Sequence, residues 1–359
     1  MKSKIKKLIQ KLNPSKTKIL EPLAKYTTIG IGGPAEIFYE PTTKDELITA
    51  VRAARALEIP ITMIGGGSNI LVSDTGIKGI VIRNRSDKIR VFWKYNITKQ
   101  QYIDTNNLKV KHRYQVTNTN IHSFSDLNYD ESMYPRIKVY LESGVNMPYA
   151  INYLLSKGIT GLQWYARIPG YLGGWIYNNT HGGTHLISEL VDSVEVIDEN
   201  NEIKNISNQE CSFDYDKSRF HNTNEIILGA TLNLFLGDVA KARYVLTEWA
   251  KKKSNQPINS PGCIFKNISD EDRQRLNLPT NSTGYIIEHI LKLSELKIGN
   301  ASISHTHHNF IVNNGKAKAT DVLKIIGTIK QEAKKQLNLN LETEIFFLGF
   351  NKSELEEIY

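Results

Sequence analysis

The sequence predicts a protein of mixed α and β structure, α/β or α+β, with two or three domains. Its 359 residues exceed the length of one average domain. Residues 26–84 alternate between strand-like and helix-like patterns in the order of a βαβ unit. With 40% hydrophobic and 23% charged residues the composition is that of an ordinary soluble globular protein, and no apolar run has the about 18–20 residues of a membrane span.

The βαβ-like region begins with a strand in "AEIFYEP", which is followed by a helix in "TKDELITAVRAARALEIP". Thr43 is the expected N-cap of this helix, and Pro60 ends it. The apolar face of the helix is formed by Leu47, Ile48, Val51 and Ala54. A buried strand in "ITMIGGG" and another in "GIKGIVIRN" complete the unit.

Further elements follow the same periodicity rules. They are a strand in "IKVYLESG", a helix in "MPYAINYLLSKG", a hairpin in "SVEVIDENNEIKNIS", a strand in "EIILGATLNLFLG", a basic helix over 238–256, a helix in "ATDVLKIIGTIKQEAKKQL" and a strand in "LETEIFFLGF". Residues 85–136 are polar, aromatic and rich in Asn, Lys and Tyr, which indicates a surface insertion. We place the main domain boundary near residue 237.

The N-terminal segment, residues 1–20, begins with the basic amphipathic stretch "MKSKIKKLIQKL". Its apolar face consists of Ile5, Leu8, Ile9 and Leu12. It lacks the unbroken apolar core and the small-residue cleavage site of a signal peptide. Two interpretations stay open: a helix that docks on the protein body, which we expect, or one that lies on an anionic membrane surface.

The formal net charge of +8 suits anionic ligands such as nucleotides, and equally a merely basic surface. No nucleic-acid-binding motif accompanies the charge, so no nucleic-acid partner is expected. Cys211 and Cys263 are the two cysteines, and they form neither a disulfide framework nor a zinc-binding spacing. This usage indicates a reducing compartment, and we expect a cytoplasmic protein.

Glycine-rich segments indicate a phosphate-binding function. "GIGGPA" matches G-x-G-x-x-A, but a strand rather than a helix follows Pro34, which excludes a Rossmann dinucleotide site. "IGGGSNILV" places glycines at the end of a strand, where backbone N–H groups can approach a pyrophosphate; a plain tight turn is the alternative. "IPGYLGG" is a second tight segment. Two such loops are consistent with FAD binding by a fold other than the Rossmann fold. The candidate cofactor residues are Gly65, Gly66, Gly67, Ser68, Asn69, Ile168, Pro169, Gly170, Gly173 and Gly174.

Seven segments, in order along residues 20 to 350, together resemble the MurB family of UDP-N-acetylenolpyruvoylglucosamine reductases. They are "YTTIGIGGPAE", "IGGGSNILV", "GITGLQWYARIPGYLGGWIYNN", "CSFDYDKSRF", "PGCIFKN", "ISHTHHNFIVNNG" with "ATDVL", and "LETEIFFLG". The insertion 85–136 is the main part that does not match.

The resemblance implies an α+β fold. A two-part FAD-binding domain of the PCMH/vanillyl-alcohol-oxidase type would cover 21–237, and a C-terminal α+β substrate-binding domain would cover 238–359. The implied activity belongs to peptidoglycan synthesis: NADPH reduces FAD, and hydride then reaches the enolpyruvyl ether of a UDP-sugar, giving UDP-N-acetylmuramate. A monomer is implied. Two alternatives are another PCMH-type flavin oxidoreductase and a non-catalytic binder of flavin or UDP-sugar.

The implied chemistry needs a general acid, because hydride addition leaves an enol-like dianion that must be protonated on carbon. The resemblance assigns this role to Cys263, which otherwise reads as a small buried hydrophobe. Lys266 and Asn267 would face the substrate, and Glu344 would hold or relay a proton. The amides of Asn178 and Asn179, after the second glycine loop, can bond the flavin ring or the substrate carboxylate.

One segment departs from the family. Where its F-x-Y-R-x-S pattern carries an arginine that stabilises the enolate, this chain has Asp216. Arg219 or Lys217 can take over that role, Arg167 can compensate, or the protein reduces its substrate poorly; we expect Arg219 to be catalytic.

Two further residues are assigned to the substrate by the resemblance. Tyr215 belongs to the departing segment, and His307 belongs to "HTHH". A structural role for His307 stays open. The histidines lack a third ligand at a known spacing, so no metal site is predicted.

Overall fold

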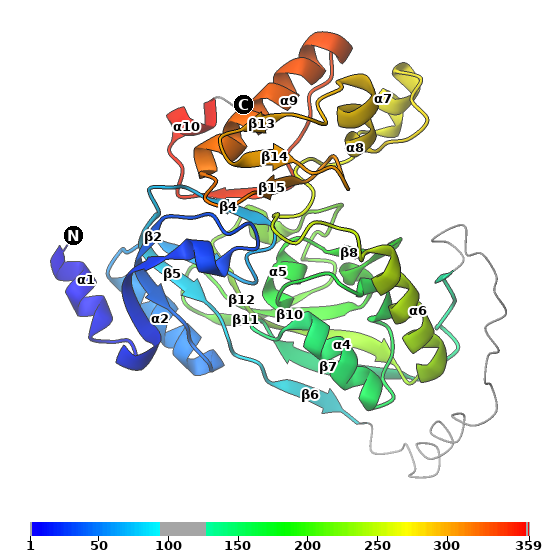
Figure 1. Cartoon of the computed structure of the whole chain (residues 1–359). Coiled ribbons are helices and arrows are strands. Elements are labelled where there is room, and N and C mark those ends of the chain that lie inside the picture. Colours follow the sequence, from blue (N-terminus) through cyan, green and yellow to red (C-terminus); the bar gives the residue numbers. More distant parts are fainter. Residues whose placement is uncertain (1, 94–126, 357, 359) are drawn as a thin grey trace. The chain divides into compact units, whose positions relative to one another are not determined.

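The computed structural model describes residues 2–93, 127–356 and 358 (Figure 1). Most of the predicted insertion 85–136 therefore lies outside the described residues. The chain divides into two compact units. The first unit contains residues 1–40, 53–83 and 255–359, and the second contains residues 41–52 and 84–254. Each unit is built from segments that are distant in sequence.

The N-terminal half of the first unit is a four-stranded sheet in the order β1-β2-β5-β3. The strands are β1 (Thr17–Pro22), β2 (Pro34–Tyr39), β3 (Ile61–Ile64) and β5 (Ile77–Arg83). β2 and β3 both run parallel to β5, whereas β1 pairs antiparallel with β2. The parallel strands are nearly continuous apolar runs, as expected for strands covered on both faces. The three strands predicted in residues 26–84 are thus confirmed.

Helix α2 (Lys44–Ala56) connects β2 to β3 and crosses from the second unit into the first. The hydroxyl of Thr43 accepts a hydrogen bond from the Glu46 N–H at 3.2 Å, which confirms the predicted N-cap. Helix α1 (Lys2–Ile9) precedes the sheet. Leu8 and the following Leu12 are buried, and Lys4 forms an ion pair with Glu58 at 2.6 Å. The expectation that this segment docks on the protein body is confirmed.

The C-terminal half of the first unit surrounds the long helix α9 (Ala319–Leu337), whose bounds agree with the predicted helix. Its buried face, which includes Val322, Ile326 and Ile329, belongs to a core shared with a three-stranded sheet, β13-β14-β15. The other elements are β13 (Lys297–Ile298), β14 (Ala301–Ile303), β15 (Ile311–Asn313), α7 (Asp270–Arg275), α8 (Thr283–Tyr285), η7 (Ile286–Ile290), β16 (Phe346–Leu348) and α10 (Lys352–Glu356).

A short parallel pairing joins the two halves of the first unit. Strand β4 (Ile70–Val72) pairs with β16 in the register Ile70–Phe346, Leu71–Phe347 and Val72–Leu348. The Asp74 carboxylate, just after β4, accepts hydrogen bonds from the Ala319 and Thr320 N–H groups at 2.9 and 3.3 Å. A carboxylate at this position stabilises the start of α9. The C-terminal residues are therefore fastened to the segment that contains the first glycine loop.

The second unit is built on an antiparallel sheet in the order β11-β10-β12-β7-β6. Its elements are β6 (Ile89–Phe92), β7 (Arg136–Glu142), α4 (Met147–Ser156), α5 (Leu172–Tyr177), β8 (His181–Gly182), β9 (His185–Leu186), β10 (Val191–Ile197), β11 (Ile203–Ser207), β12 (Ile226–Phe235) and α6 (Val239–Lys252). The predicted hairpin is formed by β10 and β11. Ala242, Val245 and Trp249 of α6 belong to this unit's core, so the units divide after Ser254 and not at 237.

Among the helices of the described residues, none combines the length and the apolar character that a membrane span requires.

Candidate active site

The first predicted cofactor loop, Gly65–Asn69, leaves β3 and enters β4 in the first unit. Gly67 has a φ of 68°, and a Cβ atom there would collide with the Tyr26 backbone. Its carbonyl oxygen accepts hydrogen bonds from the Thr28 N–H and hydroxyl at 3.0 and 3.2 Å. Only glycine fits this left-handed, closely packed position. The loop is therefore held in one conformation by "YTTIG".

The same loop is bonded to the C-terminal segments of the first unit. The Asn69 carbonyl accepts the Phe346 N–H at 3.0 Å, and the Asn69 amide donates to the Glu344 carbonyl at 3.4 Å. The Thr28 hydroxyl also donates to the Ser260 carbonyl at 2.6 Å. The structure thus brings the predicted phosphate loop beside the segments that contain Cys263 and Glu344.

Cys263 begins a short extended segment that lies between two others. On one side Ile264 donates its N–H to the Asn309 carbonyl at 2.8 Å, and Cys263 forms a bridge with Phe310. On the other side Glu344 donates its N–H to the Ile264 carbonyl at 2.8 Å. Backbone bonds on both sides fix the path of residues 263–266. They place Cys263 and Glu344 on adjacent extended segments.

Asn309 holds this arrangement and was not identified from the sequence. It is buried, and its amide donates to the Phe265 carbonyl at 2.8 Å while accepting the Phe265 N–H at 3.0 Å. A side chain that satisfies both backbone groups of one residue fixes that residue firmly. The available signal was an asparagine inside the otherwise apolar end of "HTHHNFIV". We interpret it as a positioning residue.

The two cysteines lie in different environments and form no disulfide. Cys211 is fully buried in the core of the second unit, and burial raises the pKa of its thiol to about 12. Cys263 is only partly buried. A thiol that must meet a substrate needs such exposure, whereas Cys211 behaves as a small core residue.

The other predicted substrate residues of the first unit differ in their surroundings. Lys266 donates its N–H to the Glu342 carbonyl at 2.9 Å, and its Nζ lies 3.3 Å from the Glu342 carboxylate. Asn267 is exposed. Both side chains follow Cys263 directly, so the fold keeps the three residues on one short segment.

His307 packs its ring 4.5 Å from that of Phe310, the bridge partner of Cys263. Burial lowers the pKa of its imidazole, which favours the neutral form. Its Nδ1 atom is buried and has no hydrogen-bond partner among the described residues. A buried, unsatisfied nitrogen beside the candidate acid suits a ligand contact.

The neighbouring histidines do not assemble a metal centre. His308 lies 3.0 Å from the Glu288 carboxylate, and His305 lies 3.6 Å from that of Glu295. Within residues 2–93 and 127–356, no group of three or more His, Cys, Asp or Glu side chains is arranged to hold a metal ion.

The second predicted cofactor loop, residues 168–174, belongs to the second unit. Gly170 has a φ of 126°, and its carbonyl accepts the Met147 N–H at 3.1 Å. Gly173 donates its N–H to the Ser143 carbonyl at 2.8 Å. A Cβ atom on Gly174, by contrast, would meet no described heavy atom within 4 Å outside its own helix. The fold itself therefore does not require glycine at position 174.

A buried polar atom lies close along the chain to this open position. The Asn178 Oδ1 atom is buried and has no hydrogen-bond partner among the described residues. An open backbone and an unsatisfied amide oxygen on one short segment fit a bound polar cofactor such as FAD. The residues present therefore agree with the predicted cofactor.

We expect Gly174→Ala to weaken FAD binding at least about tenfold, because the new methyl group would fill space that the ligand needs. The same change should leave the cofactor-free protein as stable or up to about 1 kcal/mol more stable, since alanine favours helix. Flavin fluorescence titration and thermal melting measure the two effects. Gly173→Ala is the contrast: its Cβ would lie 3.2 Å from the Ser143 Cβ, so melting should fall. Unchanged FAD affinity in Gly174→Ala would contradict the assignment.

The departing segment "FDYDKSRF" forms a tight turn in the second unit. Asp214 and Lys217 exchange backbone hydrogen bonds at 3.0 and 3.2 Å, which leaves Tyr215 and Asp216 at the tip. The Asn179 amide donates to the Asp214 carbonyl at 2.8 Å, and the Ser218 hydroxyl donates to the Tyr177 carbonyl at 2.6 Å. These bonds fasten the turn to the segment that follows the second glycine loop. Tyr215 is exposed, as a substrate contact requires.

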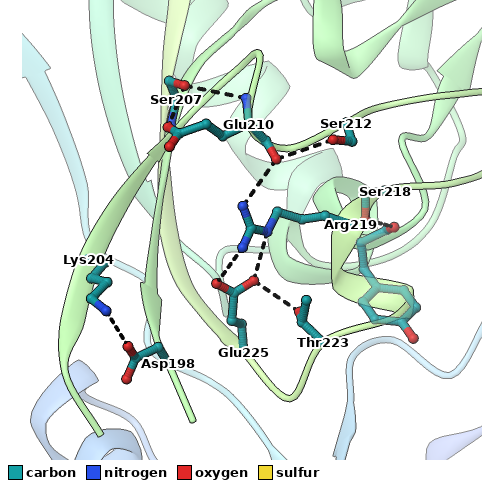
Figure 2. Close-up of polar contacts among 10 residues, drawn as sticks. Asp198, Lys204, Ser207, Glu210, Ser212, Ser218, Arg219, Thr223 and Glu225 are labelled. Carbon is teal, nitrogen blue, oxygen red and sulfur yellow. Dashed lines mark hydrogen bonds and ion pairs between the residues drawn. The ribbon is translucent and has the colours of Figure 1, made fainter. Parts of the chain in front are cut away.

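Arg219 lies in a structural network (Figure 2). Its Nε and Nη2 atoms donate to the two carboxylate oxygens of Glu225 at 3.0 and 3.1 Å, and its Nη1 donates to the Glu210 carbonyl at 3.2 Å. The Glu225 side chain is only 9% exposed, so its carboxylate is largely removed from water. This geometry explains Arg219 as a structural ion pair. The expected catalytic role gains no support from it and stays a prediction.

Comparisons with known proteins agree with this architecture. Residues 253–348 match the family model described as UDP-N-acetylenolpyruvoylglucosamine reductase, C-terminal domain. Residues 35–96 and 120–207 match the FAD binding domain, so both candidate cofactor loops lie in matched segments. The unmatched residues 97–119 fall inside the predicted insertion.

Relatives match along almost the whole chain. The UDP-N-acetylenolpyruvoylglucosamine reductase of Pediococcus pentosaceus is 30% identical over 92% of this chain and 94% of its own. That of Caldanaerobacter subterraneus subsp. tengcongensis is 30% identical over 96% of this chain and 98% of its own. The solved reductase (MurB) of Thermus caldophilus is similar with a TM-score of 0.65 and 25% identity, over 93% of this chain and 98% of its own. The α+β fold with a FAD-binding domain and a reductase C-terminal domain is confirmed, and this chain belongs to the UDP-N-acetylenolpyruvoylglucosamine reductase family.

Proposed function

We propose that this protein reduces UDP-N-acetylglucosamine enolpyruvate to UDP-N-acetylmuramate with NADPH, a step of peptidoglycan precursor synthesis. The observation that carries the proposal is the hydrogen bonding of the loop Gly65–Asn69 to the segment of Glu344 and Phe346, next to the segment of Cys263. One unit thereby places a phosphate-binding loop beside a candidate acid. FAD, when bound, supplies hydride transfer from NADPH to the substrate.

Residues of the first unit divide the remaining tasks. Cys263 donates the proton to the carbon that bears the ether oxygen, since an ordinary thiol is protonated at neutral pH and can yield its proton to a carbanion-like centre. Glu344, on the adjacent extended segment, holds or relays a proton to that site. Lys266 provides positive charge, and Asn267 and His307 provide hydrogen bonds to the sugar nucleotide.

Residues of the second unit complete the proposal. Gly170, Gly173 and Gly174, with Ile168 and Pro169, bind the cofactor in the second unit, and the unsatisfied Asn178 oxygen accepts a hydrogen bond from it. Tyr215, exposed at the tip of its turn, contacts the substrate. We leave Arg219 out of the mechanism because Glu225 and the Glu210 carbonyl bind its guanidinium.

Two other functions were considered from the sequence. An oxidase or dehydrogenase that shares only the flavin-binding domain is disfavoured by the reductase C-terminal domain match over 253–348. A non-catalytic binder of flavin or UDP-sugar is motivated by Asp216, which would repel the developing negative charge unless a cation accompanies it. We also propose a cytoplasmic, monomeric protein.

An anaerobic two-step assay tests the proposal. Purified protein loaded with FAD is mixed with NADPH, and the loss of the flavin absorbance is followed; the enolpyruvyl UDP-sugar is then added. Return of the absorbance, with UDP-N-acetylmuramate detected by mass spectrometry, is the expected result. UDP-N-acetylglucosamine is the matched control, since it lacks the enolpyruvyl group and should restore nothing. Bleaching by NADPH without recovery on adding the sugar would refute the proposed reduction.

A further inference from the structure

The carboxylate of Asp216, the residue that stands in place of the family arginine, is nearly removed from water. Its side chain is 10% exposed. One oxygen, Oδ1, lies 3.3 Å from the His181 Nδ1 atom. The other, Oδ2, is buried and has no hydrogen-bond partner among the residues described. A buried carboxylate needs a hydrogen-bond donor or a cation nearby, and the His181 imidazole is the group that meets its Oδ1 atom.

The surrounding backbone holds this pair in place. Asp216 has a φ of 49°, a left-handed conformation that aspartate and asparagine tolerate better than most residues. The His181 ring stacks on that of Tyr215, with centroids 5.5 Å apart and planes at 19°. His181 itself begins β8, which pairs antiparallel with β9. The His181 imidazole is therefore oriented by the Asp216 carboxylate, by the Tyr215 ring and by the position of its backbone in β8.

The pair lies on the segments that the site already uses. His181 follows Asn178, the residue with the unsatisfied oxygen, along the same stretch after the second glycine loop. Asp216 shares its turn with Tyr215, and the Asn179 amide binds that turn to this stretch at 2.8 Å. The His181 side chain is 40% exposed, so a ligand can approach it.

Three cations of the second unit were candidates for the charge of the missing arginine. Arg219 is held by Glu225 through two hydrogen bonds. Lys217 and Arg167 are exposed, and neither is oriented by any described ion pair. His181 differs from them because a buried carboxylate orients its imidazole. That carboxylate belongs to Asp216, which occupies the position of the family arginine. Preorganised charge is more effective than mobile charge at stabilising a developing anion.

We propose that His181, protonated and oriented by Asp216, binds the substrate carboxylate and stabilises the dianion that hydride addition creates. In this arrangement Asp216 does not oppose the reaction; it holds the cation that replaces the arginine. His181 is a catalytic residue in this proposal, and Asp216 is a positioning residue. The proposal rests on the proposed function for its substrate.

Binding measurements test the proposal independently of turnover. The FAD-loaded protein is titrated with the enolpyruvyl UDP-sugar and with UDP-N-acetylglucosamine, which lacks the carboxylate. Wild type should prefer the carboxylated sugar, and His181→Ala should lose about tenfold or more of that preference. His181→Arg should restore much of it, because the charge returns. Asp216→Asn keeps the left-handed turn but removes the charge, so it should lose part of the preference.

The matched control is His185→Ala, which removes another histidine–carboxylate pair of the same unit, between His185 Nδ1 and Glu189 at 3.0 Å. It should keep the preference of wild type for the carboxylated sugar. In the two-step assay, the His181→Ala variant should be reduced by NADPH at the wild-type rate. Only its reoxidation by the enolpyruvyl UDP-sugar should be slower. Unchanged preference in His181→Ala, or an equal loss in His185→Ala, would overturn the proposal. If wild type shows the preference, His181→Ala loses it and neither protein turns over the sugar, the proposed reduction is refuted while the role of His181 in binding is supported.

Discussion

Cys263→Ala should accept reducing equivalents from NADPH at the wild-type rate and then fail to pass them efficiently to the sugar. Without the thiol, the carbon that bears the ether oxygen has no proton donor, and general acid catalysis contributes about 100- to 10,000-fold. The rate of the second step should fall by about that factor. Cys263→Ser should retain much of the rate, because a hydroxyl at the same position also carries a proton. Stopped-flow absorbance of the flavin measures both steps.

The contrast between the two steps separates chemistry from packing. Cys211→Ala is the matched control: it removes the other thiol, which is fully buried in the second unit. Loss of that sulfur should lower the melting temperature, and it should not slow one of the two steps more than the other. If Cys263→Ala instead slows both steps equally and melts earlier, Cys263 is a packing residue and the proton must come from elsewhere.

Arg219→Ala should destabilise the protein by about 2–4 kcal/mol, because it leaves the Glu225 carboxylate buried without its partner. Because the Arg219 side chain is 31% exposed, we expect a loss of stability near the lower end of the range for breaking a buried ion pair. Urea denaturation measures the change. Glu225→Gln should also destabilise, and to a smaller extent, since an amide can still accept from the guanidinium.

The double variant Arg219→Ala/Glu225→Ala completes the cycle. It should be less destabilised than Arg219→Ala alone, because no charge is then left unpaired in the interior. The two-step assay on Arg219→Ala decides between the two roles of this residue. Near-normal stability combined with a selective loss of the sugar step would support the catalytic role that the sequence suggested.

Local patterns predicted the elements well where the stabilising interactions are local. The helix α9 was predicted with the bounds it has, and Thr43 was identified as a cap, because helix periodicity and capping are read within one or two turns. The strand expected over residues 341–350 is shorter, Phe346–Leu348. Its preceding residues pair instead with the segment of Cys263, and its own partner is β4. No local pattern reports such distant partners.

The candidate site shows the same limit. The order of motifs assigned Cys263, Glu344 and both glycine loops to one site, and the structure shows the first of these loops hydrogen-bonded to the segment of Glu344. It did not reveal that Asp216 lies beside His181, because these residues are 35 positions apart and meet only after distant segments fold. Arg219 and Glu225 are close in sequence, but the irregular segment between them has no periodicity from which their ion pair could be predicted. Asn309 was missed because its function is to satisfy the backbone of Phe265, a contact 44 positions along the chain.

The pairing of the first glycine loop with the C-terminal strand has a consequence for biosynthesis. Asn69 and Glu344 are 275 positions apart, so the loop gains its neighbouring segment only after residue 344 has been synthesised. The second unit, which is nearly continuous from residue 84 to 254, can fold earlier. A truncated chain that ends before β16 would leave the β4 edge open to other strands. The first glycine loop can therefore reach its final hydrogen bonding only after β16 has been synthesised.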